Sequence, residues 1–519
     1  MIHLKIDTKD IAVPEGTTVL EAAKTVGIKI PSMCFMEGFE NCPSCMVCMV
    51  KDRKSGNMTS SCALKVTEGM DLLSDDPDVT ESRKEALELL LSDHIGDCEA
   101  PCSLACPAGM NIPLMNRLIA SEKFSESLKV VKEDIALPYV LGYICPAPCE
   151  KACRRKQVDE AVSVCILKRF VAAEDEKKGL HKLPEKLADS HKKIAIIGTG
   201  PAGLASAFYL LQKGYACVLF DKNELPGGAL RYNIPEEELP RHVIDAEVDL
   251  IRRYGAEFKL NTAITDDIFT NEIKKSFDAV IVATGDIAVT NHLTQLQYSK
   301  TGIVAEDGTF ATPEPGIFAC GSVIRSQKMA VRAVAQGKAA AISADLFLRG
   351  QKPVKPLKRF NSRFDKLQEP EYAEYLKESI PDHRLAPSGG YLTGFSRDEA
   401  VKEAMRCMHC DCRKMDNCML RNFSDEYNAD RKKFIIAERR TLTKQFQHDK
   451  VVYEPEKCIR CGLCVEITIQ SKEITGLSFV GRGFDVRIDV PFSQSIREGL
   501  THAAKKCVEA CPTGALAFK

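Results

Sequence analysis

Cysteine is the residue type whose spacing could carry chemistry in this chain. It accounts for 23 of the 519 residues, and all of them except Cys217 and Cys320 stand in short groups. The first residues, MIHLKIDTKD, lack the charged-then-apolar layout of a secretory signal, so we expect the thiols to stay reduced. Clustered thiols in a reducing compartment indicate metal, because thiolate ligands must converge within a few ångströms. The groups therefore predict iron–sulfur clusters or zinc.

The first group has gaps of ten, two and thirteen residues between its successive cysteines, Cys34, Cys45, Cys48 and Cys62. Four thiolates match the four ligand positions of a [2Fe-2S] core. The spacing resembles the N-terminal [2Fe-2S] domain of the large peripheral subunit of complex I and of NADH-linked [FeFe] hydrogenases. Zinc is the alternative occupant. Cys42 is then a spare thiol, expected to be a small buried residue.

The second group lies in two segments, DHIGDCEAPCSLACP and ICPAPCEKAC. Its six thiols resemble the N-terminal dicluster domain shared by the small subunit of NADPH-dependent glutamate synthase and dihydropyrimidine dehydrogenase. In that family the ligands of two [4Fe-4S] clusters interleave along the chain. The resemblance implies one cluster held by Cys98, Cys102 and Cys153, and a second held by Cys106, Cys145 and Cys149.

Each of these two clusters lacks one ligand. His94 stands four residues before Cys98, where the family has a cysteine, and complex I also uses a His-x3-Cys start; the alternative is an exposed histidine. For the second cluster, Cys165 precedes by one helical turn the position where relatives have glutamine or glutamate. That position is Lys168 here, and a cationic lysine cannot ligate iron. We therefore predict Cys165 as the ligand; the alternative is a structural thiol.

A glycine turn, Gly198-Thr199-Gly200-Pro201-Ala202-Gly203, follows the strand-like run IAIIG and opens a helical run. Asp221 comes 23 residues after the first glycine, at the end of the next predicted strand, where a carboxylate can bond ribose hydroxyls. Glycines let the backbone approach a pyrophosphate, and the N-terminus of a helix favours its negative charge. The pattern predicts a dinucleotide site.

The similarity to the glutamate synthase small-subunit family continues beyond this turn, and it implies that the dinucleotide is FAD. The matching positions are Lys222, Gly228, Arg231, Ala283, Thr284, Gly285 and Gly321. Ser322 departs from the family, which has an aspartate there that bonds the ribityl chain. A second departure lies between Gly285 and Gly308. The family has a whole NADPH-binding domain there, whereas 22 residues separate the two glycines here, too few for a βαβ unit of about 30 residues. The sequence thus predicts FAD without a nicotinamide site.

Two further cysteine groups stand near the end of the chain. The first, Cys407, Cys410, Cys412 and Cys418, has gaps of two, one and five residues and could bind [4Fe-4S] or zinc. The second resembles the ferredoxin-like insert of complex I and of [FeFe] hydrogenases. It predicts one [4Fe-4S] held by Cys458, Cys461, Cys464 and Cys511; Cys507 is either a leftover thiol or a substitute for Cys511. Thr468 stands where a two-cluster ferredoxin would have another cysteine.

The elements that must position these residues indicate a multidomain protein of α+β and α/β class. We predict a β-grasp [2Fe-2S] domain over residues 1–76, an α-helical dicluster domain over 77–190 and a doubly wound FAD-binding domain over 191–350. A polar connector that contains the Cys407–Cys418 group follows over 351–450, and a ferredoxin-like domain over 451–519.

Composition excludes other classes. The 71 basic and 72 acidic residues give a formal charge of -1, which provides no electropositive surface for nucleic acid. No apolar run approaches the 18 or so residues that span a bilayer, so a soluble cytoplasmic protein without membrane insertion is expected.

Together the predicted cofactors are FAD, one [2Fe-2S] and up to four [4Fe-4S]. The predicted function is an electron-transfer subunit of a larger cytoplasmic, anaerobic oxidoreductase complex. It would relay electrons between an NAD(P)H- or ferredoxin-linked partner, such as an NADH-dehydrogenase-like FMN subunit, and a substrate-reducing subunit. Electron bifurcation at FAD is a further hypothesis. Two alternatives remain: a conducting scaffold with a structural FAD, and a self-sufficient NAD(P)H-dependent reductase or glutamate synthase small subunit.

Overall fold

The computed structural model describes residues 1–39, 43–179, 183–286, 293–356, 358–364, 366–435 and 439–519. The chain divides into two compact units. Unit 1 comprises Met1–Glu99, Lys358–Lys377 and Cys410–Lys519, and unit 2 comprises Ala100–Leu357 and Glu378–His409. The five predicted segments remain a prediction. The spare thiol, Cys42, lies outside the described residues.

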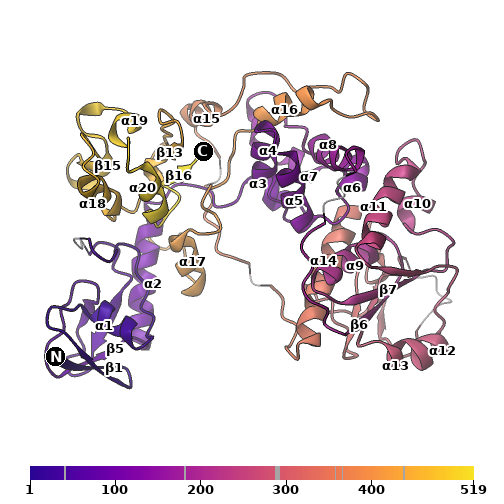
Figure 1. Cartoon of the computed structure of the whole chain (residues 1–519), viewed down its shortest axis with the longest axis horizontal. Coiled ribbons are helices and arrows are strands. Elements are labelled where there is room, and N and C mark those ends of the chain that lie inside the picture. Colours follow the sequence, from indigo (N-terminus) through magenta and orange to yellow (C-terminus); the bar gives the residue numbers. More distant parts are fainter. Residues whose placement is uncertain (40–42, 180–182, 287–292, 357, 365, 436–438) are drawn as a thin grey trace. The chain divides into compact units, whose positions relative to one another are not determined.

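Unit 1 begins with a five-stranded sheet of order β2-β1-β5-β3-β4 (Figure 1). Apolar residues alternate along the first strands, so that Leu4 and Ile6 face the core while their neighbours face solvent. Thr18 caps the following helix through a capping box with Glu21. The elements are β1 (Ile2–Ile6), β2 (Lys9–Val13), α1 (Val19–Thr25), β3 (Met49–Asp52), β4 (Met58–Ser60), β5 (Met70–Leu73) and α2 (Pro77–Ser92). This is the predicted N-terminal β domain.

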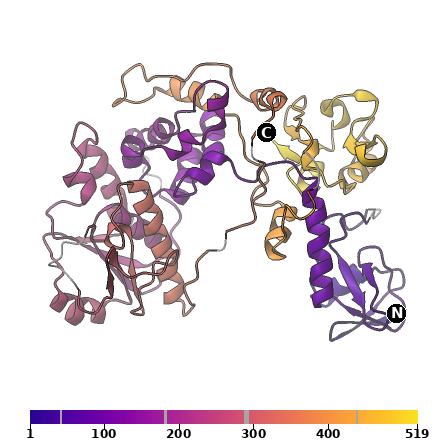
Figure 2. The ribbon, with the colours of Figure 1, turned by 180° about the vertical axis from the view of Figure 1, so that it is seen from behind.

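The rest of unit 1 consists of short elements around two small antiparallel sheets, in which β13 pairs with β16 and β14 pairs with β15. Their bounds are α15 (Glu369–Leu376), α17 (Met419–Glu426), β13 (Val451–Tyr453), α18 (Leu463–Gln470), β14 (Ser478–Val480), β15 (Arg487–Asp489), α19 (Ile496–Gly499), α20 (Ala504–Ala510) and β16 (Leu516–Phe518). Buried residues of α17 and α18 share one hydrophobic core with the N-terminal sheet and α2. Figure 2 shows α2 running from that sheet toward the C-terminal elements of the same unit.

Unit 2 begins with short helices, as predicted for the dicluster domain. They are α3 (Pro101–Ala105), α4 (Ile112–Ala120), α5 (Phe124–Asp134), α6 (Pro138–Ile144), α7 (Pro148–Lys151) and α8 (Val164–Lys177), with α16 (Arg397–Met405) packed on α4. The run MNRLIASEKFSESLKVVKED has a helical pattern. The structure divides it into α4 and α5 at Glu122, whose φ of +57° cannot continue a helix.

A parallel sheet of order β12-β9-β6-β7-β8 forms the second part of unit 2. Its central strands are buried on both faces, which explains the unbroken apolar runs IAII and AVIV. The elements are β6 (Lys193–Ile197), α9 (Pro201–Gln212), β7 (Ala216–Phe220), α10 (Ala229–Tyr232), α11 (Arg241–Arg253), β8 (Glu257–Lys259), α12 (Asp266–Ile268), α13 (Lys274–Ser276), β9 (Ala279–Val282), β10 (Tyr298–Ser299), β11 (Gly302–Ile303), β12 (Ile317–Ala319) and α14 (Ala330–Leu348). Ligands of such sheets bind beyond the carboxyl ends of the strands.

The predicted polar connector contains helices that the sequence analysis did not predict, among them α15. Its N-terminus carries a capping box between Gln368 and Glu371. The Glu371 carboxylate is buried, accepts a hydrogen bond from the backbone N–H of Leu442 at 3.0 Å and pairs with the Arg439 guanidinium. These contacts tie α15 to a segment that lies seventy residues later in the sequence. Among the described residues, no helix combines the length and apolarity that crossing a bilayer requires.

Candidate functional site

The four thiols of the first group come together in unit 1. Cys34, Cys45 and Cys48 lie in the segment between α1 and β3, and Cys62 follows β4. All four are buried, and the sulfur atoms of Cys34 and Cys45 are 3.4 Å apart. The backbone N–H and hydroxyl of Ser61 both donate to the carbonyl of Cys48, at 3.1 and 2.7 Å, which holds the two loops together. The sequence reading missed this serine because its role exists only in the fold.

Hydrogen bonds among these four thiols shift their pKa values. A hydrogen bond from Cys45, supported by one from Cys62, holds the pKa of Cys34 well below its usual range, and a hydrogen bond from Cys62 lowers the pKa of Cys48 to about 6. The pKa of Cys45 is raised in return, because it donates to Cys34 and is buried. Thiolate is the form that binds metal, so the lowered pKa values of Cys34 and Cys48 favour metal binding.

A second set of thiols comes together in unit 2, at the ends of short helices. Cys145 ends α6, Cys149 lies within α7, Cys106 ends α3 and Cys165 lies in the first turn of α8. The Cys165 sulfur lies 3.9 Å from the carbonyl oxygen of Cys145, and interactions with the Cys145 and Cys149 thiols affect the Cys165 pKa. Its backbone N–H donates to Glu150 Oε1 at 3.0 Å, which fixes the start of α8.

Lys168 lies one turn after Cys165 and is buried beside this second set of thiols. Burial lowers the Lys168 pKa, but the thiolates of Cys165, Cys145, Cys149 and Cys106 outweigh that effect and raise it. The four thiolates stabilise the buried, charged ammonium of Lys168. The ammonium in turn compensates the negative charge that these thiolates would bring to a cluster.

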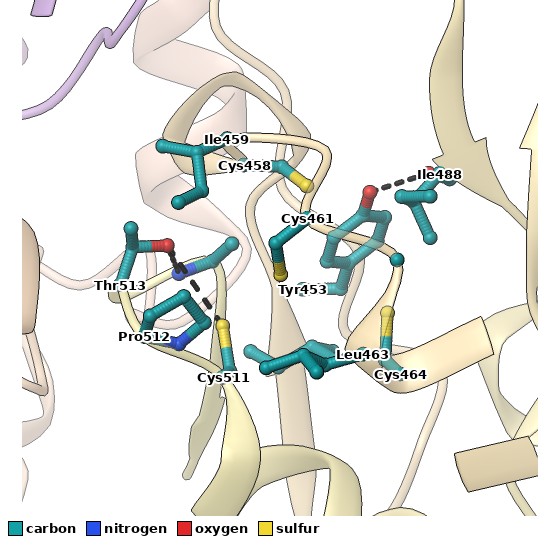
Figure 3. Close-up of a pocket in the computed structure, with 13 residues that line it drawn as sticks. Tyr453, Cys458, Ile459, Cys461, Leu463, Cys464, Ile488, Cys511, Pro512 and Thr513 are labelled. Carbon is teal, nitrogen blue, oxygen red and sulfur yellow. Dashed lines mark hydrogen bonds between the residues drawn. The ribbon is translucent and has the colours of Figure 1, made fainter. Parts of the chain in front are cut away.

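A third set of thiols surrounds a pocket of about 340 Å³ in unit 1 (Figure 3). The pocket is lined by Cys458, Cys461, Cys464 and Cys511 together with apolar side chains and Tyr453. Arg460 donates its backbone N–H to the Cys458 sulfur at 3.3 Å, and the Tyr453 hydroxyl bonds the carbonyl of Ile488. Backbone N–H donors to sulfur and a dry, apolar wall are features of iron–sulfur sites.

Cys507 does not line this pocket. Its thiol lies 3.7 Å from the carbonyl of Cys464 and is fully buried. Thr468 is also committed elsewhere: its hydroxyl donates to the carbonyl of Val465 at 2.8 Å and accepts from the backbone N–H of Leu477 at 3.1 Å. Both residues therefore support the fold around the pocket.

The remaining predicted ligands are divided between the units. Unit 1 contains His94, Cys98, Cys410, Cys412 and Cys418, whereas unit 2 contains Cys102, Cys153 and Cys407. The two ligand sets predicted for them, His94 with Cys98, Cys102 and Cys153, and Cys407 with the three later cysteines, stay predictions. Among the described residues, no group of three or more histidine, cysteine or acidic side chains is arranged to hold a single metal ion.

The glycine turn lies at the carboxyl end of β6 in unit 2. A Cβ at Gly198 would come within 2.3 Å of the Ala283 carbonyl oxygen, and a Cβ at Gly203 within 2.0 Å of the Gly198 carbonyl oxygen. A Cβ at Gly200 would instead meet no protein atom within 4 Å. Two glycines thus permit close packing, and the third leaves open space before the N-terminus of α9. This is the arrangement that a pyrophosphate requires.

Asp221 lies beside this turn, at the end of β7. Its Oδ2 accepts from the backbone N–H and the hydroxyl of Thr199, at 2.8 and 2.6 Å. Its Oδ1 accepts from the backbone N–H and the side-chain amide of Asn223, at 3.0 and 2.9 Å. The carboxylate therefore fixes the glycine turn, in addition to the ribose contact predicted for it.

The other predicted dinucleotide residues surround the same strand ends. A Cβ at Gly228 would lie 2.9 Å from the Gly200 Cα, so these two backbones are in contact. Arg231 is buried, donates to the carbonyl of Pro226 at 2.8 Å and pairs with Asp245. Pro201 opens α9, and Ala202 is buried in the same helix. Lys222 and Thr284 are exposed, and Gly285 has a φ of +82°. Gly321 and Ser322 begin the turn after β12.

One residue near this site was missed. Gln336, in α14, accepts a hydrogen bond from the backbone N–H of Gly321 at 2.9 Å through its side-chain oxygen. It holds the turn that follows β12. No short motif marks a glutamine in the middle of a helix, so no signal in a single sequence could have found it.

Comparison with known families identifies three domains. A family described as "2Fe-2S iron-sulfur cluster binding domain" matches residues 1–77, and one described as "Dihydroprymidine dehydrogenase domain II, 4Fe-4S cluster" matches residues 89–180. A family described as "NAD(P)-binding Rossmann-like domain" matches residues 196–259. The chain thus has a [2Fe-2S] domain, a helical [4Fe-4S] domain and a dinucleotide-binding domain. This domain content is that of an oxidoreductase subunit.

Three curated relatives resemble parts of the chain. The NADPH-Fe(3+) oxidoreductase subunit beta of Geobacter sulfurreducens is 38% identical over 36% of this chain and 28% of its own length. The NADP(+)-dependent formate dehydrogenase subunit beta of Moorella thermoacetica is 34% identical over 42% and 32%. The glutamate synthase [NADPH] small chain of Bacillus subtilis is 36% identical over 35% and 36%. The chain therefore matches about a third of the length of these relatives.

Proposed function

We propose that this chain is a flavin- and iron–sulfur-containing electron-transfer subunit of a larger cytoplasmic, anaerobic oxidoreductase complex. The observation that carries the proposal is that one chain contains both three convergent sets of cysteines and a dinucleotide cradle. The relatives' names support it, because they describe subunits of NADPH- or NADP-dependent oxidoreductases.

The first set, Cys34, Cys45, Cys48 and Cys62, would hold the [2Fe-2S] core. The second set, in unit 2, and the third set, around the pocket of unit 1, would each hold one [4Fe-4S] cluster. Iron–sulfur clusters pass single electrons, whereas a flavin takes up two and releases them singly. The protein's own residues bind these groups, exclude water from them and compensate their charge.

The dinucleotide is proposed to be FAD. The cradle of Gly198, Gly200 and Gly203 suits any dinucleotide pyrophosphate, so the choice rests on the resemblance of the whole segment from Gly198 to Gly321 to flavin-binding relatives. The electron pair would then come from a separate NAD(P)H- or ferredoxin-linked subunit and leave through a substrate-reducing subunit. Electron bifurcation at the flavin is a refinement of the same proposal.

The test is anaerobic reduction of the isolated chain. We expect bound FAD and acid-labile sulfide, reduction of flavin and clusters by photoreduction, and no bleaching by NADH or NADPH alone. Bleaching by a pyridine nucleotide would favour the self-sufficient reductase or glutamate synthase small subunit. Near absence of sulfide would contradict the proposal.

A second candidate is a conducting scaffold whose FAD is structural. It is favoured by Ser322, which stands in place of the family's aspartate that bonds the ribityl chain. Photoreduction distinguishes the two candidates: a structural flavin would be absent or would not exchange electrons with the clusters.

The C-terminal pocket provides one prediction. Replacing Cys511 with serine is expected to remove the [4Fe-4S] cluster of this pocket, about four iron atoms per chain, because Cys511 lines the pocket and lies opposite the Cys458–Cys464 loop. Replacing Cys507 with serine is expected to leave the iron content unchanged. Iron and sulfide analysis of both variants measures this, and the reverse pattern would make Cys507 the ligand.

Lys168 provides a second prediction. Lys168→Gln is expected to lower the midpoint potential of the unit 2 cluster by roughly 100 mV, because one unit charge about 6 Å away changes the energy by about 3 kcal/mol at an effective dielectric constant of about 20. Lys151→Gln, an exposed lysine at the end of α7, is the matched control and should shift the potential much less. A redox titration followed by electron paramagnetic resonance (EPR) measures both, and equal shifts would contradict the prediction.

A further inference from the structure

Three cysteines from two distant segments of unit 1 approach one another. They are Cys98, just after α2, and Cys412 and Cys418, which precede α17. The backbone N–H of Cys412 donates to the carbonyl of Cys98 at 3.1 Å. The thiolates of Cys412 and Cys98 also help to raise the pKa of Cys418, after burial, so the three sulfur atoms are within electrostatic reach of each other. The spacing of the sequence had placed these cysteines in two different groups.

Backbone contacts fix the two segments where they meet. The N–H of Cys98 donates to the carbonyl of Ser362 at 3.0 Å, and the N–H of Met419, next to Cys418, donates to the carbonyl of Pro512 at 2.8 Å. Gly514 leaves room for the Cys412 thiol, because a Cβ at this glycine would lie 2.2 Å from the Cys412 sulfur. The thiols are thus held by the turn that follows Cys511, a ligand position of the C-terminal pocket.

His94 belongs to the same surroundings through Lys457. The buried Lys457 is an electrostatic neighbour of His94, Cys98 and Cys412. The His94 Nδ1 atom is buried and has no hydrogen-bond partner among the described residues. The backbone N–H of Ile95, next to His94, donates to the carbonyl of Glu456 at 2.9 Å, which holds His94 beside the segment that contains Lys457.

We propose that Cys98, Cys412 and Cys418, with His94 as the fourth ligand, form one iron–sulfur site of the [4Fe-4S] class within unit 1. This inference rests on the proposed function, since it requires that the thiols hold iron. It replaces the two ligand sets predicted for these residues from the sequence. Lys457 and Arg421 lie next to the thiols and compensate the negative charge of three thiolates.

The site adds a third centre to a series within unit 1. Cys418 is within electrostatic reach of Cys511, a lining residue of the C-terminal pocket. Cys461, which also lines that pocket, is within electrostatic reach of Cys34, which belongs to the [2Fe-2S] set. Cys34, Cys461 and Cys418 also share one hydrophobic core. The new site therefore lies next to the C-terminal cluster, and that cluster lies next to the [2Fe-2S] set.

The test compares single and double variants of the full chain, purified anaerobically. Cys98→Ala and Cys412→Ala are each expected to lose about four iron atoms and four sulfides, and the double variant is expected to lose the same amount, because both residues serve one cluster. The double variant Cys98→Ala/Cys511→Ala is expected to lose about twice as much. Cys320→Ala, a buried thiol outside every set, should lose none.

If the Cys98→Ala/Cys412→Ala variant loses twice as much iron and sulfide as each single variant, the two residues do not share a cluster. The proposed function would still hold in that case, provided that the wild type contains iron. A wild type without iron would remove the proposed function itself. His94→Cys provides a measurement on a chain that keeps all its clusters. It is expected to lower the midpoint potential of one EPR signal, the one that Cys412→Ala abolishes, because a thiolate replaces a neutral imidazole. An unchanged potential would exclude His94 as the ligand.

Discussion

Replacing Cys165 with alanine is expected to remove one complete [4Fe-4S] cluster, about four iron atoms and four sulfides per chain, together with its EPR signal. The structure supports a large effect because the Cys165 sulfur, at the start of α8, lies 3.9 Å from the carbonyl oxygen of Cys145 and interacts with the thiols of Cys145 and Cys149. Three thiols without a fourth ligand leave one iron open to solvent and to oxidation. Iron and sulfide analysis, with EPR of the dithionite-reduced protein, measures the loss.

The matched control is Cys217→Ala, which removes another buried thiol of unit 2 that belongs to no predicted ligand set. It should keep the full iron content. A second variant, Lys168→Gln in the Cys165→Ala background, offers the amide that relatives have at this position and is expected to restore part of the cluster. Full iron in Cys165→Ala alone would show that Cys165 is a structural thiol.

Replacing Gly200 with alanine is expected to reduce the flavin content at least about tenfold while the chain stays folded. Gly200 has a φ of -73°, which alanine adopts readily, and its Cβ would meet no protein atom within 4 Å. The methyl group would therefore occupy the space that a pyrophosphate needs, at a cost to folding of about 1 kcal/mol or less. Flavin absorbance and thermal unfolding of the same preparation measure both effects.

Two further variants serve as controls for the flavin content and stability of Gly200→Ala. Gly203→Ala is expected to lose flavin and also to unfold at lower temperature, because its Cβ would lie 2.0 Å from the Gly198 carbonyl oxygen. Lys213→Ala, an exposed residue just after the C-terminus of the same helix, should change neither property. Flavin that remains at the wild-type level in Gly200→Ala would contradict a dinucleotide at this turn.

Local patterns were sufficient for much of this molecule. The alternation of apolar residues in HLKID is typical of a strand, and the structure has β1 there. The glycine turn after IAIIG predicted the start of a helix, and α9 begins at that place. The family comparisons confirm the [2Fe-2S] domain, the helical [4Fe-4S] domain and the Rossmann-like domain. These features are local because hydrophobic period and turn chemistry operate over a few residues.

Other features depend on contacts between distant segments. Helix α15 was missed because its run, EPEYAEYL, lacks an apolar stripe, and it is held by the pairing of Glu371 with Arg439. The break at Glu122 was missed because the flanking residues keep a helical pattern, although the backbone turns there. Gln336 and Ser61 act on turns far away in sequence, and no short motif records such a partner.

The predicted ligand sets show most clearly the difference between local sequence patterns and contacts that form only on folding. Spacing alone brings together thiols that are close in sequence, such as Cys458, Cys461 and Cys464, because a short loop cannot separate them. It could not bring Cys98 to Cys412, since more than 300 residues lie between them and the backbone contact that joins them forms only in the folded chain. The amino-acid sequence by itself therefore determined which residue types this protein uses and which domains contain them. The tertiary structure decided which distant thiols lie close together, because only folding fixes the distances that a metal cluster requires.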